Sequence, residues 1–186
     1  MTLIAIIYHS EKGRTSDIAG EIAKGVETIN GAKAELLPVT DLMDFDLLEK
    51  CDALVFGCPT YMGSASARFK TFMDASSEAW MQQRWKNKIA AGFTNSYAYS
   101  GDKLNVLVQL AVFAAQHGMI WVGNAEMQTG PMPQDINRLG SFLGLMTQSD
   151  AKVDPVVPPE GDRQTARLFG QRIAEATSRF LAGKQS

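Results

Sequence analysis

Short apolar runs alternate with stretches of helical periodicity along most of the chain. Residues 3–8 and 53–57 are unbroken apolar runs of strand length, a pattern typical of strands buried on both faces of a parallel sheet. Between them, apolar residues from Ile18 to Ile29 recur at helical spacing, and Asn30 and Gly31 end the pattern. This alternation predicts right-handed crossovers and a parallel sheet with helices on both faces.

The remaining segments extend the same alternation. We expect strands at residues 3–8, 32–39, 53–57, 88–96 and 119–124. We expect helices at residues 18–29, 65–80, 105–117 and 164–181, a short helix or turn at 41–50, and a long loop from 125 to about 160. These elements predict an α/β fold with a flavodoxin-like, doubly wound, five-stranded parallel sheet in the order 2-1-3-4-5. The length of 186 residues suits one domain, residues 1–186.

Charge and cysteine content narrow the class of protein. With 18 basic and 20 acidic residues, the formal charge is −2, so neither nucleic acid nor an anionic membrane is an expected partner. Cys51 and Cys58 lack CxxC spacing and are too few for a disulfide scaffold, which favours reduced thiols in a cytoplasmic protein. Polar residues interrupt the longest apolar stretch, residues 104–123, so no membrane insertion is expected. With only two histidines, a histidine-based metal site is not expected either.

Three loops are the expected ligand-binding region. In doubly wound sheets, ligands bind beyond the carboxyl ends of the strands, at the point where the strand order reverses. This rule selects the loops that follow Tyr8, Gly57 and Phe93.

The loop after Tyr8 combines hydroxyl groups, a glycine and two cations just before a helix. Its candidate ligand-binding residues are Ser10, Glu11, Lys12, Gly13, Arg14 and Thr15. The loop matches neither the GxGxxG nor the P-loop motif. Hydroxyl groups and helix N-terminal N–H groups can nevertheless surround a single phosphate. The alternative is a helix cap, in which Thr15 or Ser16 satisfies backbone N–H groups and nothing binds.

The other two loops carry small polar residues and aromatic rings. After Gly57 the candidates are Pro59, Thr60, Tyr61, Met62 and Gly63, and after Phe93 they are Thr94, Asn95, Ser96, Tyr97, Tyr99 and Gly101. Amides and hydroxyls can hydrogen-bond to the edge of a planar heterocycle, while tyrosine rings cover its faces. An ordinary surface turn is the alternative for each loop. Because all three loops fall at one edge of the sheet, together they favour a bound phosphate that carries a flat ring.

Several motifs resemble a known family of flavoproteins. They are SxxGxT at residues 10–15, PTYxG at 59–63, FKTFMD at 69–74, AAQHGM at 114–119 and the closing segment 158–174. In these motifs the sequence resembles the flavodoxin-like NAD(P)H:quinone oxidoreductases of the tryptophan-repressor-binding-protein (WrbA) type, and the resemblance extends over nearly the whole chain.

The resemblance implies an enzyme with FMN as cofactor and NADH or NADPH as transient donor. The phosphate of FMN is expected in the first loop and its isoalloxazine ring between the other two. The implied reaction is the two-electron reduction of a quinone, or a similar flat acceptor, in a ping-pong cycle. The resemblance also gives catalytic roles to Trp80, beside the flavin, and to His117, which in this family lies by the flavin of a neighbouring subunit. For both residues the alternative is a structural role at a helix end.

The resemblance further implies a homodimer or homotetramer, with the apolar segment 104–116 as the expected interface. Segment 41–50 is shorter than the insertion that helps to build the tetramer in this family, so a dimer is favoured. The third loop also lacks the glycine-rich run of the family.

Two other functions stay open. The first is a flavodoxin-like FMN-binding electron carrier that does not oxidise nicotinamides itself. The low net charge, Trp80 and His117 argue against it. The second is a flavin-free signalling domain of receiver type, which needs an acidic pocket at the strand ends. The first strand is instead followed by His9 and Ser10.

Overall fold

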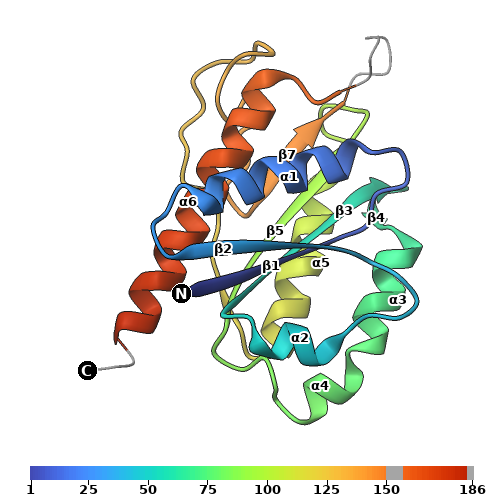
Figure 1. Ribbon diagram of the computed structural model, residues 1–186. Coiled ribbons are helices and arrows are strands. Elements are labelled where there is room, and N and C mark those ends of the chain that lie inside the picture. Colours follow the sequence, from blue (N-terminus) through green and yellow to red (C-terminus); the bar gives the residue numbers. More distant parts are fainter. Residues whose placement is uncertain (150–156, 184–186) are drawn as a thin grey trace.

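A parallel sheet forms the centre of the computed structural model, which describes residues 1–149 and 157–183 (Figure 1). Its main strands, in spatial order, are β2 (Ala32–Pro38), β1 (Thr2–Tyr8), β3 (Ala53–Tyr61), β5 (Ile89–Ser96) and β6 (Ile120–Trp121), and each neighbouring pair is parallel. Because β5 and β6 are the fourth and fifth of the expected strands, the predicted order 2-1-3-4-5 is confirmed.

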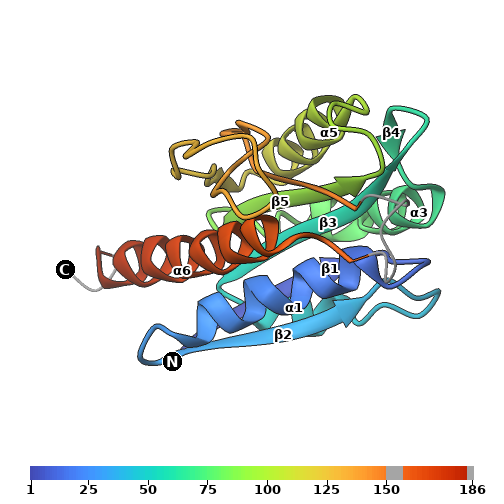
Figure 2. The same ribbon diagram turned by 90° about the horizontal axis from the view of Figure 1, so that it is seen from above.

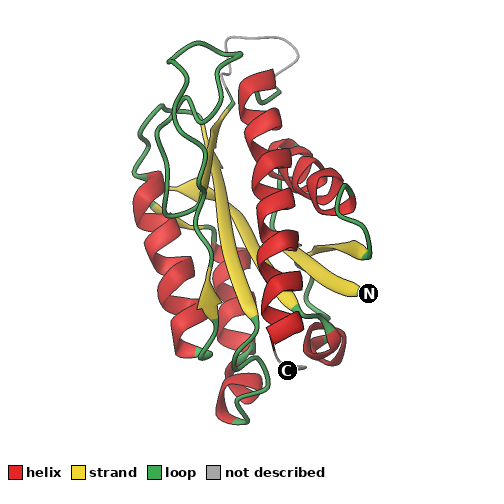
Figure 3. Ribbon diagram, turned by 90° about the vertical axis from the view of Figure 1, so that its left-hand side faces the viewer, coloured by secondary structure: helices red, strands yellow, loops and turns green. Residues whose placement is uncertain are grey.

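Helices cover both faces of this sheet (Figures 2 and 3). One face packs against α1 (Arg14–Glu27) and α6 (Glu160–Gly183). The other packs against α2 (Phe45–Lys50), α3 (Ala67–Ala75), α4 (Ser77–Met81) and α5 (Lys103–Gln116). Along β1 the buried side chains alternate between the two cores: Ile4 and Ile6 face α1 and α6, while Ala5 and Ile7 face the other layer. This two-sided burial explains why β1 is an unbroken apolar run.

The fifth strand position differs from the prediction. Strand β6 covers only two residues beside the start of β5, and β7 (Leu145–Gln148) pairs in parallel with the end of β5. The expected strand 119–124 was therefore too long, and the expected loop from 125 to about 160 wrongly included a strand. Residues 150–156 of that loop lie outside the described residues. Strand β7 has only four residues, too few for a strand pattern to stand out in the sequence.

Two other elements also differ from the sequence prediction. Strand β3 continues through Tyr61 and returns in β4 (Ser64–Ala65), so Pro59 to Tyr61 belong to a hairpin and not to a loop. Met62 and Gly63 join the two strands with φ values of 50° and 74°, the two positive angles that a tight two-residue hairpin turn requires. The expected helix 65–80 is two helices, α3 and α4, which are separated at Ser76.

Helices α1 and α6 approach each other closely at two glycines. A Cβ atom added at Gly25 would lie 1.9 Å from the backbone oxygen of Arg167, and one added at Gly170 would lie 2.1 Å from the backbone oxygen of Ile22. Because both obstacles are helical backbone, a side chain at either position would force the helices apart. This pair of glycines therefore fixes how close α1 and α6 can lie.

We expect Gly170→Ala to lower the free energy of unfolding by about 1–3 kcal/mol, the usual cost of an overpacked core. Gly20→Ala is the matched control, because a Cβ at Gly20 has nothing within 4 Å. That change should raise stability by up to about 1 kcal/mol through helix propensity. Urea unfolding of both variants measures the difference, and equal effects would contradict the close packing.

Candidate functional site

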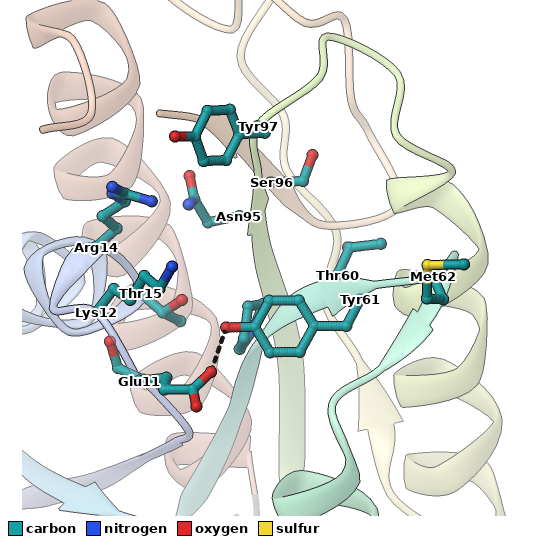
Figure 4. A pocket seen from close by; sticks show the side chains of 12 residues that line it. Glu11, Lys12, Arg14, Thr15, Thr60, Tyr61, Met62, Asn95, Ser96 and Tyr97 are labelled. Atoms are coloured by element: carbon teal, nitrogen blue, oxygen red, sulfur yellow. Dashed lines mark hydrogen bonds between the residues drawn. The ribbon is translucent and has the colours of Figure 1, made fainter. Parts of the chain in front are cut away.

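A cavity of about 430 Å³ lies at the carboxyl edge of the sheet, a volume within the usual range for small-molecule sites (Figure 4). The residues that line it are Ser10, Glu11, Lys12, Arg14, Thr15, Pro59, Thr60, Tyr61, Met62, Asn95, Ser96 and Tyr97. They come from the segment that joins β1 to the first turn of α1, and from the ends of β3 and β5 with the residue that follows each. The structure thus brings together candidate residues from all three predicted regions.

The N-terminus of α1 forms one wall of the cavity. Gly13, with φ 83°, is the N-cap residue and supplies no side chain to bond the first turn. The hydroxyl of Ser16 donates to the Gly13 carbonyl at 2.5 Å, and the Ser16 N–H donates to the Ser10 hydroxyl at 3.1 Å. Neither Thr15 nor Ser16 therefore acts as the cap proposed as the alternative. The N–H groups of the first turn and the helix dipole are suited to an anion.

Arg14 strengthens this wall as an anion site. Its guanidinium lies over the ring of Tyr97, 5.3 Å from the ring centroid. Its Nε atom is buried and has no hydrogen-bond partner among the described residues. A buried N–H group of a cation is costly to leave unpaired, so a ligand acceptor would relieve that cost. Thr15, which is only 2% exposed, lines the same end of the cavity.

The opposite wall presents an acceptor at Thr60. The hydroxyls of Thr60 and Thr94 lie 2.8 Å apart, and Thr94 donates its own hydrogen to the Cys58 carbonyl at 2.7 Å. Because each hydroxyl has a single hydrogen, the one shared between the two threonines must come from Thr60. Thr60 then has lone pairs, and no hydrogen, left for a ligand.

Asn95 presents the complementary group. Its Oδ1 atom accepts hydrogen bonds from Thr147 at 2.8 Å and from Ser149 at 3.1 Å. The amide N–H₂ group is then available as a donor. An acceptor on Thr60 and a donor on Asn95 match the edge of a flat heterocycle that carries both kinds of group.

Two tyrosines flank the cavity on different walls (Figure 4). The hydroxyl of Tyr61 donates to Glu11 at 3.1 Å, and burial together with Glu11 raises the pKa of Tyr61. Tyr97 is held against Arg14 as described above. Both rings are partly exposed, at 42% and 53%, so they can cover a flat ligand while keeping contact with solvent.

Five of the predicted loop residues lie outside the lining of this cavity. Gly13 and Gly63 shape the turns, and Thr94 lies behind the wall with its side chain fully buried. Gly101 is another positive-φ position, where a Cβ would lie 2.7 Å from the Ser96 hydroxyl. Tyr99 turns away and stacks against Arg138, with the guanidinium 5.6 Å from the ring centroid.

Trp80 and His117 lie at the other end of the sheet from the cavity. Trp80 belongs to α4, which Figure 1 shows at the bottom of the view, far from the β3–β4 hairpin. His117 is the C-cap residue of α5, and its side chain is buried against Trp85, with ring centroids 4.2 Å apart. Within one chain the structure does not bring either residue to the cavity, so a catalytic role for them stays a prediction that requires a second chain.

The environment of His117 favours a neutral ring. The residue is 2% exposed, and its Nε2 atom lies 3.0 Å from the Ser76 hydroxyl. Burial lowers the pKa of His117 from 6.5 to about 4. At neutral pH the imidazole is therefore uncharged, and the attraction between a cation and the helix dipole does not hold it in place.

The sequence analysis missed a buried polar cluster behind the 97–101 loop. Its members are Lys103, Arg138, Gln148 and Asp162, each at most 7% exposed. One signal was available: Lys103 is a single cation at the start of an apolar helix, where the helix dipole disfavours positive charge. The other three members of the cluster come from segments distant in the sequence and share no motif with it.

Comparison with known proteins identifies the family. The chain is 36% identical over 182 residues to Flavodoxin FldP of Pseudomonas aeruginosa, an alignment that covers 94% of this chain and 96% of the relative. A solved structure described as the flavodoxin, WrbA-like protein from Agrobacterium tumefaciens superimposes with a TM-score of 0.78 at 34% identity, covering 97% of this chain and 99% of that one. The chain belongs to the WrbA-like flavodoxins.

Two further similarities describe this FMN-binding, flavodoxin-like family as one of oxidoreductases. The family described as NADPH-dependent FMN reductase matches residues 45–131. An NAD(P)H dehydrogenase (quinone) of Archaeoglobus fulgidus is 29% identical over 204 residues and covers 97% of this chain and 100% of the relative.

In this WrbA-like flavodoxin, no helix of the described ranges is long and apolar enough to cross a bilayer. Helix α5 exposes Leu104, Val108 and Val112 on successive turns, and the predicted dimer or tetramer stays a prediction.

We expect acidification to destabilise this WrbA-like flavodoxin through His117. Because the pKa is lower in the folded state than in the unfolded state, the unfolded chain binds more protons between pH 6.5 and pH 4, and stability falls as the pH falls through that window. The His117 contribution should be about 1–2 kcal/mol between pH 7 and pH 5. Urea unfolding at pH 7 and pH 5 should show that His117→Gln removes the His117 contribution to the loss of stability. An NMR titration that gives His117 of the folded protein a pKa near 6.5 would contradict the prediction.

Proposed function

We propose that the cavity binds FMN, with its phosphate at the N-terminus of α1 and its isoalloxazine ring between Tyr61 and Tyr97. The observation that carries this proposal is the buried, unpartnered Nε atom of Arg14 beside a helix start whose N-cap residue, Gly13, has no side chain to bond the first turn. A phosphate would supply the acceptor that Arg14 lacks and the negative charge that the helix dipole favours. Thr15 adds a buried hydroxyl to the same site.

The polar groups of the opposite wall suit the edge of the ring. Thr60 accepts and the Asn95 amide donates, so the pair can recognise a heterocycle edge with one donor and one acceptor. Because Thr94, Thr147 and Ser149 fix both groups from behind, their hydrogen-bonding directions are set before the ligand arrives. Such preorganisation reduces the entropy cost of binding.

We propose that the protein is an NAD(P)H:quinone oxidoreductase. Bound FMN supplies the redox chemistry, taking a hydride from a nicotinamide and passing two electrons to an acceptor. The chain provides a rim on which a flat donor and a flat acceptor can dock in turn, since Tyr61, Met62 and Tyr97 are all exposed there. The name of the Archaeoglobus fulgidus relative supports a quinone as the acceptor.

One observation favours the electron carrier as a second candidate. The two tyrosines approach the cavity from different walls, so both faces of a bound ring could be covered. A covered ring exchanges single electrons with a partner protein more readily than hydride with a nicotinamide. The 36% identical relative is itself named a flavodoxin, which supports the same alternative.

Thr15→Ala should weaken FMN binding by about 5- to 150-fold, because a buried dianion loses a hydroxyl partner worth roughly 1–3 kcal/mol. Titration of the apoprotein with FMN, followed by flavin fluorescence, gives both dissociation constants. Thr71→Ala on the exposed side of α3 is the control and should bind like the wild type. Equal constants for Thr15→Ala and wild type would contradict the phosphate site.

The flavin-loaded protein should oxidise NADH or NADPH in the presence of a quinone with ping-pong kinetics. If donor and acceptor share one side of the cavity, the donor product must leave before the acceptor enters, and double-reciprocal plots at several quinone concentrations will be parallel. Steady-state absorbance at 340 nm, the wavelength of the reduced nicotinamide, follows the reaction. Intersecting plots would reject the shared side. Flavin-loaded protein that oxidises neither nicotinamide would establish the electron carrier instead.

A further inference from the structure

Lys103 is a fully buried lysine whose ammonium group is completely hydrogen-bonded. Its Nζ atom donates to the Ser96 hydroxyl at 2.8 Å, the Ala98 carbonyl at 2.6 Å and the Tyr99 carbonyl at 2.8 Å. These contacts use all three donors of an ammonium group. Every acceptor belongs to the segment 96–99, which begins at the cavity wall.

Gln148 holds the same segment at Tyr97, between the residues that Lys103 contacts. Its Nε2 atom donates to the Tyr97 carbonyl at 2.9 Å. The carbonyls of Tyr97, Ala98 and Tyr99 therefore all point toward the buried side chains of Lys103 and Gln148. In a planar trans peptide the N–H group points opposite to the carbonyl, so the following N–H groups point away from this buried layer.

Among the described residues, the layer behind the loop carries two cations and one carboxylate. Arg138 and Asp162 form a buried ion pair, with Nε and Oδ1 2.7 Å apart, so these two charges compensate each other. Lys103 adds a second cation, and no carboxylate of residues 1–149 or 157–183 is hydrogen-bonded to it. Burial lowers the pKa of Lys103 to about 8, with Asp162 raising it and Arg138 lowering it, so the ammonium form still predominates at pH 7.

Holding a loop with a buried cation lowers the free energy of unfolding compared with holding it with a neutral donor. Burial of a charge without a paired carboxylate costs stability, and the α5 dipole disfavours a cation at this end of the helix. A neutral donor, such as the amide of Gln148, could hold carbonyl groups at lower cost. The charge itself is therefore the feature that needs a functional explanation.

We propose that Lys103 is a positioning residue of the cofactor site, which holds the 97–100 loop with its N–H groups outward and places a buried positive charge behind Ser96. The proposal rests on the proposed binding of FMN. A reduced flavin is more negative than the oxidised form, so a cation held against Ser96, which lines the cavity, favours the reduced form. Lys103 thereby raises the reduction potential of the bound cofactor.

The test compares FMN binding and the two-electron midpoint potential of the full-length protein in four forms. These are the wild type, Lys103→Met, Lys103→Gln and the control Lys88→Met. Lys88 also donates to two backbone carbonyls, those of Glu49 and Cys51, but it does so at the opposite end of the sheet. The control therefore removes a lysine that contacts carbonyls without touching the cavity.

We expect Lys103→Met to weaken binding of oxidised FMN about tenfold and binding of reduced FMN about a hundredfold. The tenfold difference corresponds to a fall of about 30 mV in the two-electron potential. Lys103→Gln, which keeps one N–H₂ donor group and is the safer variant for folding, should show the same fall with weaker loss of binding. Lys88→Met should keep the wild-type dissociation constant and potential.

The wild-type protein offers a further readout without any substitution. Raising the pH from 7 to 9 deprotonates Lys103 and should weaken FMN binding, whereas the Lys103→Gln protein should show no such dependence. Asp162 on α6, Arg138 before β7 and Tyr99 in the loop also lie against this cluster, and the Lys103→Gln protein retains all three. Any dependence that they cause would persist in that variant.

Each result decides the proposal. A wild-type potential in both Lys103 variants would overturn it even if binding were weaker, because a purely structural role lowers affinity without changing the potential. The same pH dependence in wild type and Lys103→Gln would also overturn it. Wild-type protein that binds no FMN would instead overturn the proposed function, so the two failures are distinguishable.

Discussion

The hydrogen-bonded register of three parallel strands determines where the site lies. Tyr8 of β1 pairs with Gly57 of β3, and Gly57 in turn pairs with Phe93 of β5. Because the strands are parallel and in this register, the residues that follow each of them emerge at one edge. Strands β3 and β5 continue together as far as the pair Pro59 and Asn95, which places both residues in the cavity wall. A shift of any strand along its neighbour would separate the groups that the ligand needs together.

Polar groups in this protein follow two different patterns on the two sides of the 97–101 loop. Behind the loop, the ammonium of Lys103, the Arg138–Asp162 pair and the amide of Gln148 all have hydrogen-bond partners. On the cavity side, the Nε atom of Arg14 is buried without a partner in the described chain. The satisfied layer gives the loop a defined conformation, since a partly satisfied network would allow several. The unsatisfied group on the other side is paired only when an anion binds, which couples ligand binding to stability.

The sequence revealed the parts of the fold whose signal is local. The apolar runs of β1 and β3 mark strands that are buried on both faces. Gly31, with φ 78°, lies in the turn between α1, which ends at Glu27, and β2. Pro59 was misleading because proline normally interrupts a strand. Here β1 pairs only as far as Gly57, so β3 has no neighbour on that side at Pro59 and its missing N–H breaks no bond to β1. The candidate loops could be found because each follows a strand end, whereas Lys103 and Asp162 meet only through tertiary structure.

The choice between an enzyme and an electron carrier depends on how firmly Tyr61 covers the cavity. Its hydroxyl makes one hydrogen bond, to the exposed Glu11, and such a bond contributes only about 0.5–1.5 kcal/mol net. Tyr61, like Ser10 and Glu11, lines both the cavity and a neighbouring one of about 570 Å³, which offers space for the ring to move. Movement of Tyr61 would therefore cost little compared with the binding energy of a micromolar substrate, about 8 kcal/mol. Two flanking tyrosines are thus compatible with hydride transfer, provided that a donor can displace one of them.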